Sequence, residues 1–272
     1  MKFSFLVCAL LSPFFSVLAA SVSEEQSKAP GLRSLFESPL DIDKRSPGQL
    51  IRSCTVPGTV ALTFDDGPLW YIYDLVRMLD AAGAKGTFFF NGNNHQCIYS
   101  EDNVKRVRYA YNRGHQVASH TWSHWNLSNV DPDTIHNQMW MLELALVRIT
   151  GADPAFMRPP YGSYNQQVLD VSRERGQADV IWDLDSRDSM GASVQESINI
   201  YNNMINQRPL PNGKILALNH ETRDTTVFQV MPAVLQRLKQ AGYRMVTVAE
   251  CLGKQPYRSV KAPEARTPDW KC

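Results

Sequence analysis

Two short stretches of the chain place metal ligands and proton-transfer groups beside one another. Asp65 and Asp66 end an apolar run and precede a Gly-Pro turn. His120 and His124 lie four residues apart, a spacing that lets two imidazoles on one helical face reach one ion. Two nitrogen ligands and one carboxylate oxygen leave zinc an open coordination position, as in catalytic sites. Together the stretches predict a catalytic metal site. Each alone also fits a blander interpretation, an Asp-Gly turn or a histidine pair without metal.

Three further motifs carry groups that could orient or transfer protons. Arg158 opens an R-P-P-Y stretch, Asp188 closes D-S-R-D, and His220 closes L-N-H. An arginine beside a carboxylate lowers the pKa of that carboxylate and fixes its orientation. A carboxylate bonded to a histidine keeps the imidazole protonated, as a general acid requires. A surface Pro-rich loop and a structural histidine remain open as alternatives.

Apolar runs of strand length alternate with helical patterns from Cys54 onward. We expect strands at 59–64, 87–90, 116–119, 155–157, 180–184, 215–218 and 245–248. We expect helices at about 69–82, 101–113, 132–150, 165–175, 194–208 and 226–241. This alternation predicts one parallel sheet, either a barrel or doubly wound, without a second domain. In both architectures chemistry gathers at the carboxyl ends of the strands, where the motifs above fall.

The charge of the chain is almost balanced, with 28 basic and 27 acidic residues and a net charge of +1. No surplus of positive charge is available to release counterions from nucleic acid or to hold an anionic membrane. We therefore expect no nucleic acid as a partner, while uncharged polymers and small neutral ligands stay open. Separately, we expect a monomeric protein.

The first residues have the pattern of a secretory signal. Lys2 precedes an apolar run over residues 3–17 and the small residues Ala19 and Ala20. We expect residues 1–20 to be removed, which leaves an extracellular protein without a membrane segment. An uncleaved anchor is the alternative, although the run is short for a bilayer.

Polar segments flank the expected domain at both ends. Residues 21–45 are polar and end in Lys44-Arg45, so we expect a pro-segment that is cut after this pair. The catalytic domain should then cover 46–255, and 256–272 should form a polar tail tied down by a disulfide.

Five cysteines become four once Cys8 is assigned to the signal. Four cysteines permit three pairings, which a sequence does not settle. We favour Cys54 with Cys251, because this bond would join the two ends of the domain, and it would leave Cys97 with Cys272.

The motifs TFDDGP, HTWSH, RPPY, DSRD and LNH, in this order, resemble the five motifs of the polysaccharide deacetylases, carbohydrate esterase family four. The resemblance covers about residues 54–251. The secretory signal, the dibasic pair and the sequence around Trp122 are most similar to those of fungal chitin deacetylases. The resemblance implies a deformed, TIM-like (β/α) barrel of about seven parallel strands.

The resemblance also implies a metal-dependent hydrolysis. Asp66, His120 and His124 would hold a divalent ion, usually Zn²⁺, with Co²⁺ as another possibility. Asp65 would be the catalytic base, and Arg158 would tether it. The implied substrate is chitin, chitooligosaccharide or another polysaccharide that contains N-acetylglucosamine.

Four further residues receive roles by the same resemblance. The backbone N–H of Tyr161 would help to bind the oxyanion, and Leu218 would line the acetyl pocket. His220 would be the general acid, supported by Asp188.

The chain departs from the family at Ser189, where the family has a tryptophan that walls the acetate pocket. We expect a wider or wetter pocket unless Met190 or another side chain fills the space. The sequon that begins at Asn126 lies two residues past His124, and we expect it to be unglycosylated or to point outward.

Three other functions remain open. Acetyl-xylan and peptidoglycan deacetylases share this site, and a catalytically silent chitin-binding protein would share the fold. Exposed aromatic side chains in the loops, among them Tyr99 and Trp125, could stack on sugar rings or could belong to the core.

Overall fold

The computed structural model describes residues 49–272. The signal and pro-segment expected in residues 1–45 lie outside this range. The main sheet has nine strands, namely β1 (Leu50–Ile51), β2 (Thr59–Asp65), β3 (Thr87–Phe90), β4 (Gln116–Ser119), β6 (Phe156–Met157), β7 (Ala178–Val180), β8 (Leu184–Asp185), β9 (Lys214–His220) and β10 (Arg244–Val246). Every pair in this sheet is parallel.

The strands follow the order β1-β7-β6-β4-β3-β2-β9-β8, and β10 pairs with the first half of β2. β7 and β8 are neighbours in the chain, yet they lie toward opposite ends of this order. Residues 181–183 cross between them. The sheet is therefore a curled, incompletely closed barrel, which confirms the expected deformed (β/α) barrel.

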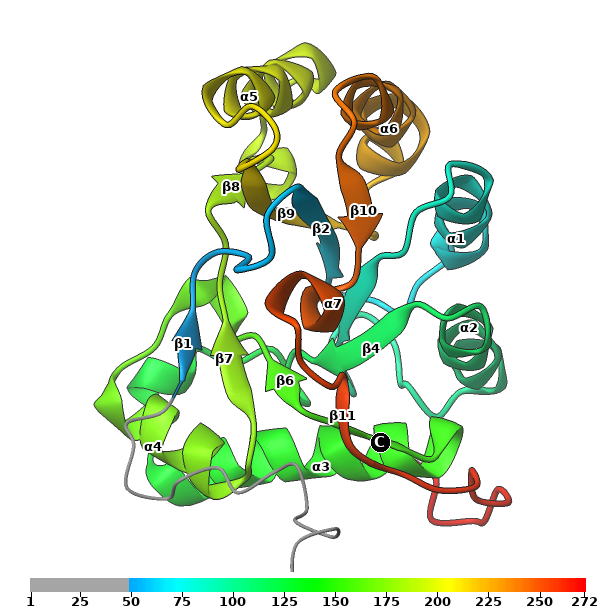
Figure 1. Ribbon diagram of the computed structural model, residues 1–272. Helices are drawn as coiled ribbons and strands as arrows, with labels where there is room; N and C mark the ends of the chain where they lie inside the picture. Colours follow the sequence, from blue (N-terminus) through cyan, green and yellow to red (C-terminus); the bar gives the residue numbers. More distant parts are fainter. Residues whose placement is uncertain (1–48) are drawn as a thin grey trace, which may run out of the picture. The chain divides into compact units, whose positions relative to one another are not determined.

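In residues 49–272, six α-helices pack outside the strands and a seventh lies inside their ring (Figure 1). The outer helices are α1 (Ile72–Ala81), α2 (Glu101–Asn112), α3 (Pro132–Thr150), α4 (Gln166–Glu174), α5 (Val194–Gln207) and α6 (Met231–Gln240). The inner helix is α7 (Val248–Leu252). None of the helices in residues 49–272 is long and apolar enough to cross a membrane.

The helix ends follow the chemistry of their first residues. Asp131 accepts a hydrogen bond from Thr134 N–H and is followed by a proline at the first position of α3. Ser193 and Glu196 form the reciprocal capping box of α5. Short 3₁₀ helices, η1 (Leu127–Asn129), η2 (Pro160–Gly162) and η3 (Asp188–Met190), follow β4, β6 and β8 in the chain. These loops carry site residues.

Alternating side chains of the strands supply two apolar layers. One side of β2, with Val60, Leu62 and Phe64, packs against the outer helices. The other side contributes Ala61 to an inner cluster around α7. The inner cluster also takes one residue from each of six other strands: Ile51, Phe89, Ala118, Phe156, Val180 and Leu216. Strands buried on both faces explain why β2 lacks an apolar–polar alternation.

Two predicted strands were wrong. The run 180–184 is two strands, because Val180 pairs with Ile51 while Leu184 pairs with Ala217 across the sheet. The last strand ends at Val246, and Val248 begins α7. The helix expected at 226–241 is confirmed over residues 226–240, and its first turn, η4 (Thr226–Val230), is π-helical and precedes α6.

The C-terminal segment is better ordered than a polar tail. β11 (Tyr257–Val260) pairs antiparallel with β5 (Ala152–Pro154), which the sequence did not predict. Both favoured disulfides are confirmed: Cys54–Cys251 joins the ends of the barrel, and Cys97–Cys272 ties down the terminal segment.

Candidate active site

The period of two along the strands brings the motifs to one mouth of the barrel. On β2, Ala61 lies in the inner cluster, so Thr63 and Asp65 continue the same face toward the carboxyl end. On β9, Leu218 and His220 continue the face of Leu216 in the same way. Asp65 and His220 are register partners, because β2 and β9 pair over seven residues. On the inner face of β2 and β9, apolar side chains are thus followed, toward the carboxyl end, by Asp65 and His220, whose side chains can transfer protons.

Asp66, His120 and His124 come together as one potential ligand set, with one donor atom from each lying within 4.8 Å of the others. Asp66 Oδ1 lies 3.6 Å from His120 Nε2 and 3.3 Å from His124 Nε2. It is buried and has no hydrogen-bond partner among the described residues. A buried carboxylate oxygen without a partner is costly, and a cation between it and the two nitrogens would remove that cost.

The tautomer of His120 fits a metal ligand. Its Nδ1 lies 2.8 Å from the carbonyl oxygen of Arg158, which can only accept a hydrogen bond. The proton is therefore on Nδ1, and Nε2 presents its lone pair toward Asp66. Burial lowers the pKa of His120 to about 3 and also lowers the pKa of His124, so both imidazoles are neutral near pH 7. The residues present fit a divalent ion of the zinc type.

Asp65 lies beside this set and is held by Arg158. Arg158 Nη1 donates to Asp65 Oδ1 at 2.8 Å and to Thr63 Oγ1 at 2.7 Å, and its guanidinium is fully buried. Burial raises the pKa of Asp65, and the charge of Arg158 opposes that rise. The second oxygen of Asp65 lies 3.7 Å from His120 Nε2, so Asp65 is next to the ligand set.

His220 and Asp188 form a second pair at the mouth. Asp188 Oδ1 lies 2.7 Å from His220 Nδ1, while Oδ2 accepts from the backbone N–H of His220 and from Thr226 Oγ1. Burial alone would lower the pKa of His220, but the hydrogen bond and charge of Asp188 outweigh it and raise that pKa to about 9. The imidazole is therefore protonated near neutral pH.

Strained backbone concentrates at this mouth. Five residues other than glycine have positive φ in residues 49–272, and all five are site residues or direct chain neighbours of one: Asp66 (73°), Thr121 (69°), His124 (56°), Tyr161 (62°) and Arg187 (59°). Each such conformation costs roughly 1–3 kcal/mol and persists only where the surroundings hold it. The surrounding contacts therefore hold these loops in strained backbone conformations, and these conformations place the side chains of the site.

The remaining predicted site residues occupy different surroundings. Leu218 is buried on β9, two residues before His220. The ring of Tyr161 is 68% exposed and lies edge-on to His124, with the ring centroids 4.7 Å apart. Ser189 is exposed in η3, and Met190 is 66% exposed, so both lie on the surface.

Four positioning residues were not identified from the sequence. Thr63 and Thr226 bond to Arg158 and Asp188. Asn91 Nδ2 donates to the carbonyls of His120 and of the next residue, which holds the histidine loop. Buried Glu221 accepts from Leu69 N–H beneath the Gly-Pro turn. Thr63 could have been found, because it lies two residues before Asp65 on the same strand face; the others depend on contacts that no local pattern specifies.

The ordered C-terminal segment supports the histidine loop from behind. Trp270 packs on Tyr99 and Tyr99 on Trp122, with ring centroids 5.4 and 6.1 Å apart. Trp122 lies in the loop between the two histidines, against Gly92. Tyr99 is only 3% exposed, so of the two loop aromatics considered above, this one belongs to the core.

Comparisons with known proteins agree with this geometry. The family described as Polysaccharide deacetylase matches residues 52–180. A chitin deacetylase of Pestalotiopsis sp is 35% identical over 90% of this chain and 77% of its own length. A probable peptidoglycan-N-acetylglucosamine deacetylase of Arthroderma benhamiae is 39% identical over 76% of this chain, which spans about half (46%) of that protein.

Solved structures show the same fold. The chitin deacetylase of the fungal pathogen Colletotrichum lindemuthianum superposes with a TM-score of 0.73 at 34% identity, over 78% of this chain and 94% of that one. The Bc1960 peptidoglycan N-acetylglucosamine deacetylase superposes with a TM-score of 0.67 at 30% identity, over 76% and 94%. With the barrel, the ligand set and the similarity along most of the sequence in agreement, this chain belongs to the polysaccharide deacetylase family.

Proposed function

We propose that the protein is a secreted, divalent-metal-dependent deacetylase that removes N-acetyl groups from chitin or chitooligosaccharides. The observation that carries the proposal is that one potential set of metal ligands lies between a carboxylate held by arginine and a histidine held by a carboxylate. Asp66, His120 and His124 form the set. Asp65 with Arg158 lies on one side, and His220 with Asp188 completes the mouth.

Asp66, His120 and His124 would hold Zn²⁺, or another divalent ion such as Co²⁺. When bound, such an ion polarises an acetamide carbonyl and lowers the pKa of a nearby water molecule. The chain contributes two neutral imidazoles and one carboxylate, a set that leaves room for water and substrate.

Asp65 acts as the base in this proposal. Its raised pKa makes it a better proton acceptor than an ordinary exposed aspartate, while Arg158 fixes which oxygen remains available. Asp65 takes a proton from water as the water oxygen bonds to the acetyl carbon. Arg158 is a positioning residue here, since it contacts Asp65 and Thr63 and not the reacting atoms.

His220 acts as the acid. Protonated through Asp188, it gives its proton to the amine nitrogen as the carbon–nitrogen bond breaks, and acetate and the free amine are the products. Asp188 keeps its own negative charge, because its hydrogen bonds from His220 and Thr226 outweigh burial and lower its pKa. The backbone N–H of Tyr161 would stabilise the oxyanion, and Leu218 would line the acetyl pocket.

The polymer is chosen by the surroundings of the site. Relatives carry the names chitin deacetylase and peptidoglycan N-acetylglucosamine deacetylase. Two fungal chitin deacetylases match this chain over 77% and 92% of their own length, against 46% for the 39% identical peptidoglycan deacetylase, and this supports chitin. Peptidoglycan and acetyl-xylan are the alternatives. A silent chitin-binding protein would not need a protonated His220 beside a buried Asp65.

Acetate release tests the proposal directly. The purified protein should release acetate from N-acetylglucosamine oligomers, lose this activity with a chelator, and regain it with Zn²⁺. Asp65→Asn should lower turnover by roughly 10²–10⁴-fold while the metal content is unchanged. If no acetate is released from chitin, xylan or peptidoglycan substrates in the presence of added metal, the enzymatic proposal is wrong.

The proposal of secretion has separate support. Two disulfides tie the described chain, and such bonds persist in oxidising compartments. N-terminal sequencing of the secreted protein should begin at Ser46, after the expected removal of the signal and the pro-segment. A terminus at Ser21 would exclude the pro-segment.

A further inference from the structure

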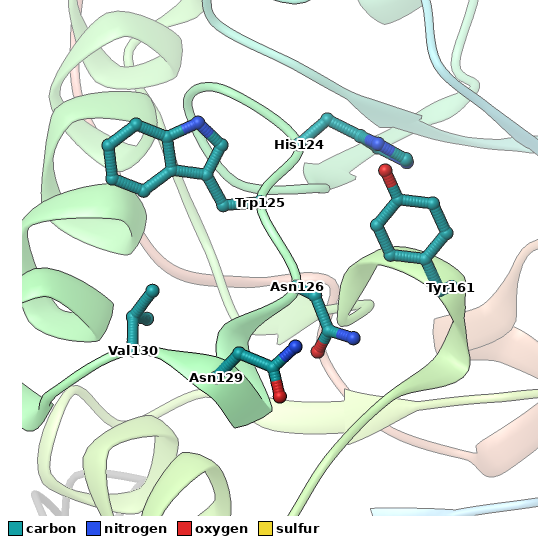
Figure 2. Close-up of a pocket in the computed structure, with 6 residues that line it drawn as sticks. All are labelled: His124, Trp125, Asn126, Asn129, Val130 and Tyr161. Atoms are coloured by element: carbon teal, nitrogen blue, oxygen red, sulfur yellow. The ribbon is translucent and has the colours of Figure 1, made fainter.

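A pocket of about 520 Å³ lies beside the ligand set, on the side of β4 and β6. Figure 2 shows the residues that line it, which come from the loop after His120 and from the R-P-P-Y turn. They are His124, Trp125, Asn126, Asn129, Val130 and Tyr161. His124 belongs to both the ligand set and the pocket wall, so a chain of sugars at the metal would continue into this pocket.

Two aromatic side chains of this pocket are left open to solvent. Trp125 is 50% exposed and Tyr161 is 68% exposed. An indole held half exposed gives up apolar burial that the neighbouring Trp122, at 9% exposure, obtains. Aromatic faces exposed beside a reactive centre are typical of binding surfaces.

The other exposed apolar side chains show that this placement is not random. In residues 49–272, seven large apolar side chains are exposed. Five of them follow the carboxyl end of a strand of the main sheet: Trp70, Trp125, Tyr161, Met190 and Phe228. The rim that carries the ligand set therefore also carries five of the seven large apolar side chains that are exposed in residues 49–272.

The polar groups of the pocket are uncharged. Asn126 and Asn129 supply two carboxamides, and no lysine, arginine, aspartate or glutamate is among the lining residues. Asn126 Oδ1 accepts from Ser128 N–H at 3.1 Å, which fixes this side chain at the start of η1. Carboxamides pair well with hydroxyl and acetamido groups, and aromatic faces pair with the apolar face of a sugar ring.

We propose that this pocket binds an uncharged N-acetylhexosamine unit next to the unit that is deacetylated, with Trp125 as the stacking residue. The inference rests on the proposed function and narrows it. A neutral acetamido-sugar polymer fits this lining, whereas the carboxylates of a glycan that carries one on every second sugar would find no lysine or arginine among the lining residues. Trp125 is thus a specificity-determining residue for a neutral polymer.

Kinetics with two substrates test the pocket. Chitotetraose reaches the pocket, whereas p-nitrophenyl acetate is too small to span both the metal and the pocket. Trp125→Ala should lower kcat/KM for chitotetraose by roughly tenfold relative to p-nitrophenyl acetate, mostly through KM. Trp125→Phe should restore most of the loss. Trp140→Ala is the matched control, because Trp140 is 46% exposed on α3 and does not line the pocket.

The outcomes separate the pocket from the proposed function. If wild-type protein deacetylates chitotetraose and Trp125→Ala, folded by circular dichroism, does so with unchanged KM, the pocket inference is overturned and the deacetylase remains. Asn129→Asp should weaken chitotetraose turnover less than Trp125→Ala does. Peptidoglycan fragments turned over as efficiently as chitotetraose would overturn the preference for a neutral polymer.

Discussion

His120 and His220 are both buried imidazoles at the carboxyl ends of parallel strands, and their pKa values move in opposite directions. His120 contacts the carbonyl of Arg158 through Nδ1, and burial lowers its pKa to about 3. His220 contacts the carboxylate of Asp188 through the same atom, and its pKa rises to about 9.

The group that accepts a hydrogen bond from Nδ1 therefore determines whether the histidine is suited to bind a metal or to act as a general acid. A neutral carbonyl fixes the tautomer and adds no charge, so desolvation dominates and Nε2 stays free for a cation. A carboxylate adds a charge that desolvation does not cancel, so the imidazolium is retained. One residue type thus serves two chemical roles about one barrel mouth.

The largest expected effect comes from removing each histidine in turn. His120→Ala should lose bound metal and lower turnover by roughly 10³-fold or more, because the ion contributes several kcal/mol to the transition state. His220→Ala should keep its metal and lose roughly 10²–10⁴-fold. Metal analysis together with acetate release measures both variants.

His115 provides the matched control for this pair. It is also a buried histidine with a pKa lowered to about 4, but it lies near Asp80. His115→Asn should retain metal and most activity. Equal metal loss in the His120 and His220 variants would contradict the division of roles.

A smaller effect, on pH dependence, should follow from Asp188→Asn. The wild-type pKa of His220 is raised, so the acid form prevails at neutral pH and is lost as pH rises through about 9. Without the carboxylate, the hydrogen bond and the charge that oppose the effect of burial most strongly are lost, so the pKa of His220 falls. The alkaline limb of the pH–rate profile should move to lower pH, so that the variant has already lost activity at a neutral pH where the wild type is still active.

The stability of the protein should report the same linkage. A raised histidine pKa stabilises the fold below about pH 6.5, and this contribution is lost as pH rises through about 9. The free energy of unfolding, measured with urea, should fall more between pH 6 and pH 10 for the wild type than for Asp188→Asn.

For the activity profile, an alkaline limb that is not shifted in Asp188→Asn would show that a group other than His220 sets this limb.

The smallest expected effect concerns Ser189, which lies next to Asp188. Ser189→Trp should change acyl preference or KM by a few-fold, because the exposed serine would be replaced by a large ring directly beside Asp188. Competition between acetyl and propionyl substrates measures it. Unchanged preference and KM would mean that another side chain walls the acyl group.

Much of the site could be predicted because each of its residues follows a strand. The period of two along β2 gives Asp65 the face of Thr63 and Ala61, and β9 carries His220 at the matching level. The helix caps at Asp131 and Ser193 were also readable, since a cap depends only on local residues.

The features that could not be predicted depend on contacts between residues far apart in the sequence. The apolar run at 180–184 gave no sign that it divides between two sides of the barrel, because strand pairing is decided by tertiary contacts. Whether Tyr99 or Trp125 is exposed was equally undetermined. Tyr99 is covered by Trp270, which reaches it only through the ordered C-terminal segment.

The disulfides and the central strand pairs join parts of the chain that are synthesised far apart in time. Cys54–Cys251 and Cys97–Cys272 join residues separated by 197 and 175 positions, and β2 pairs with β9 and β10 from the far end of the domain. During translation the central strand therefore waits for nearly the whole domain before its neighbours exist, and such non-local pairing is slow. Asp65 cannot meet His220 until then, so the growing chain should carry no working hydrolase before its barrel is complete.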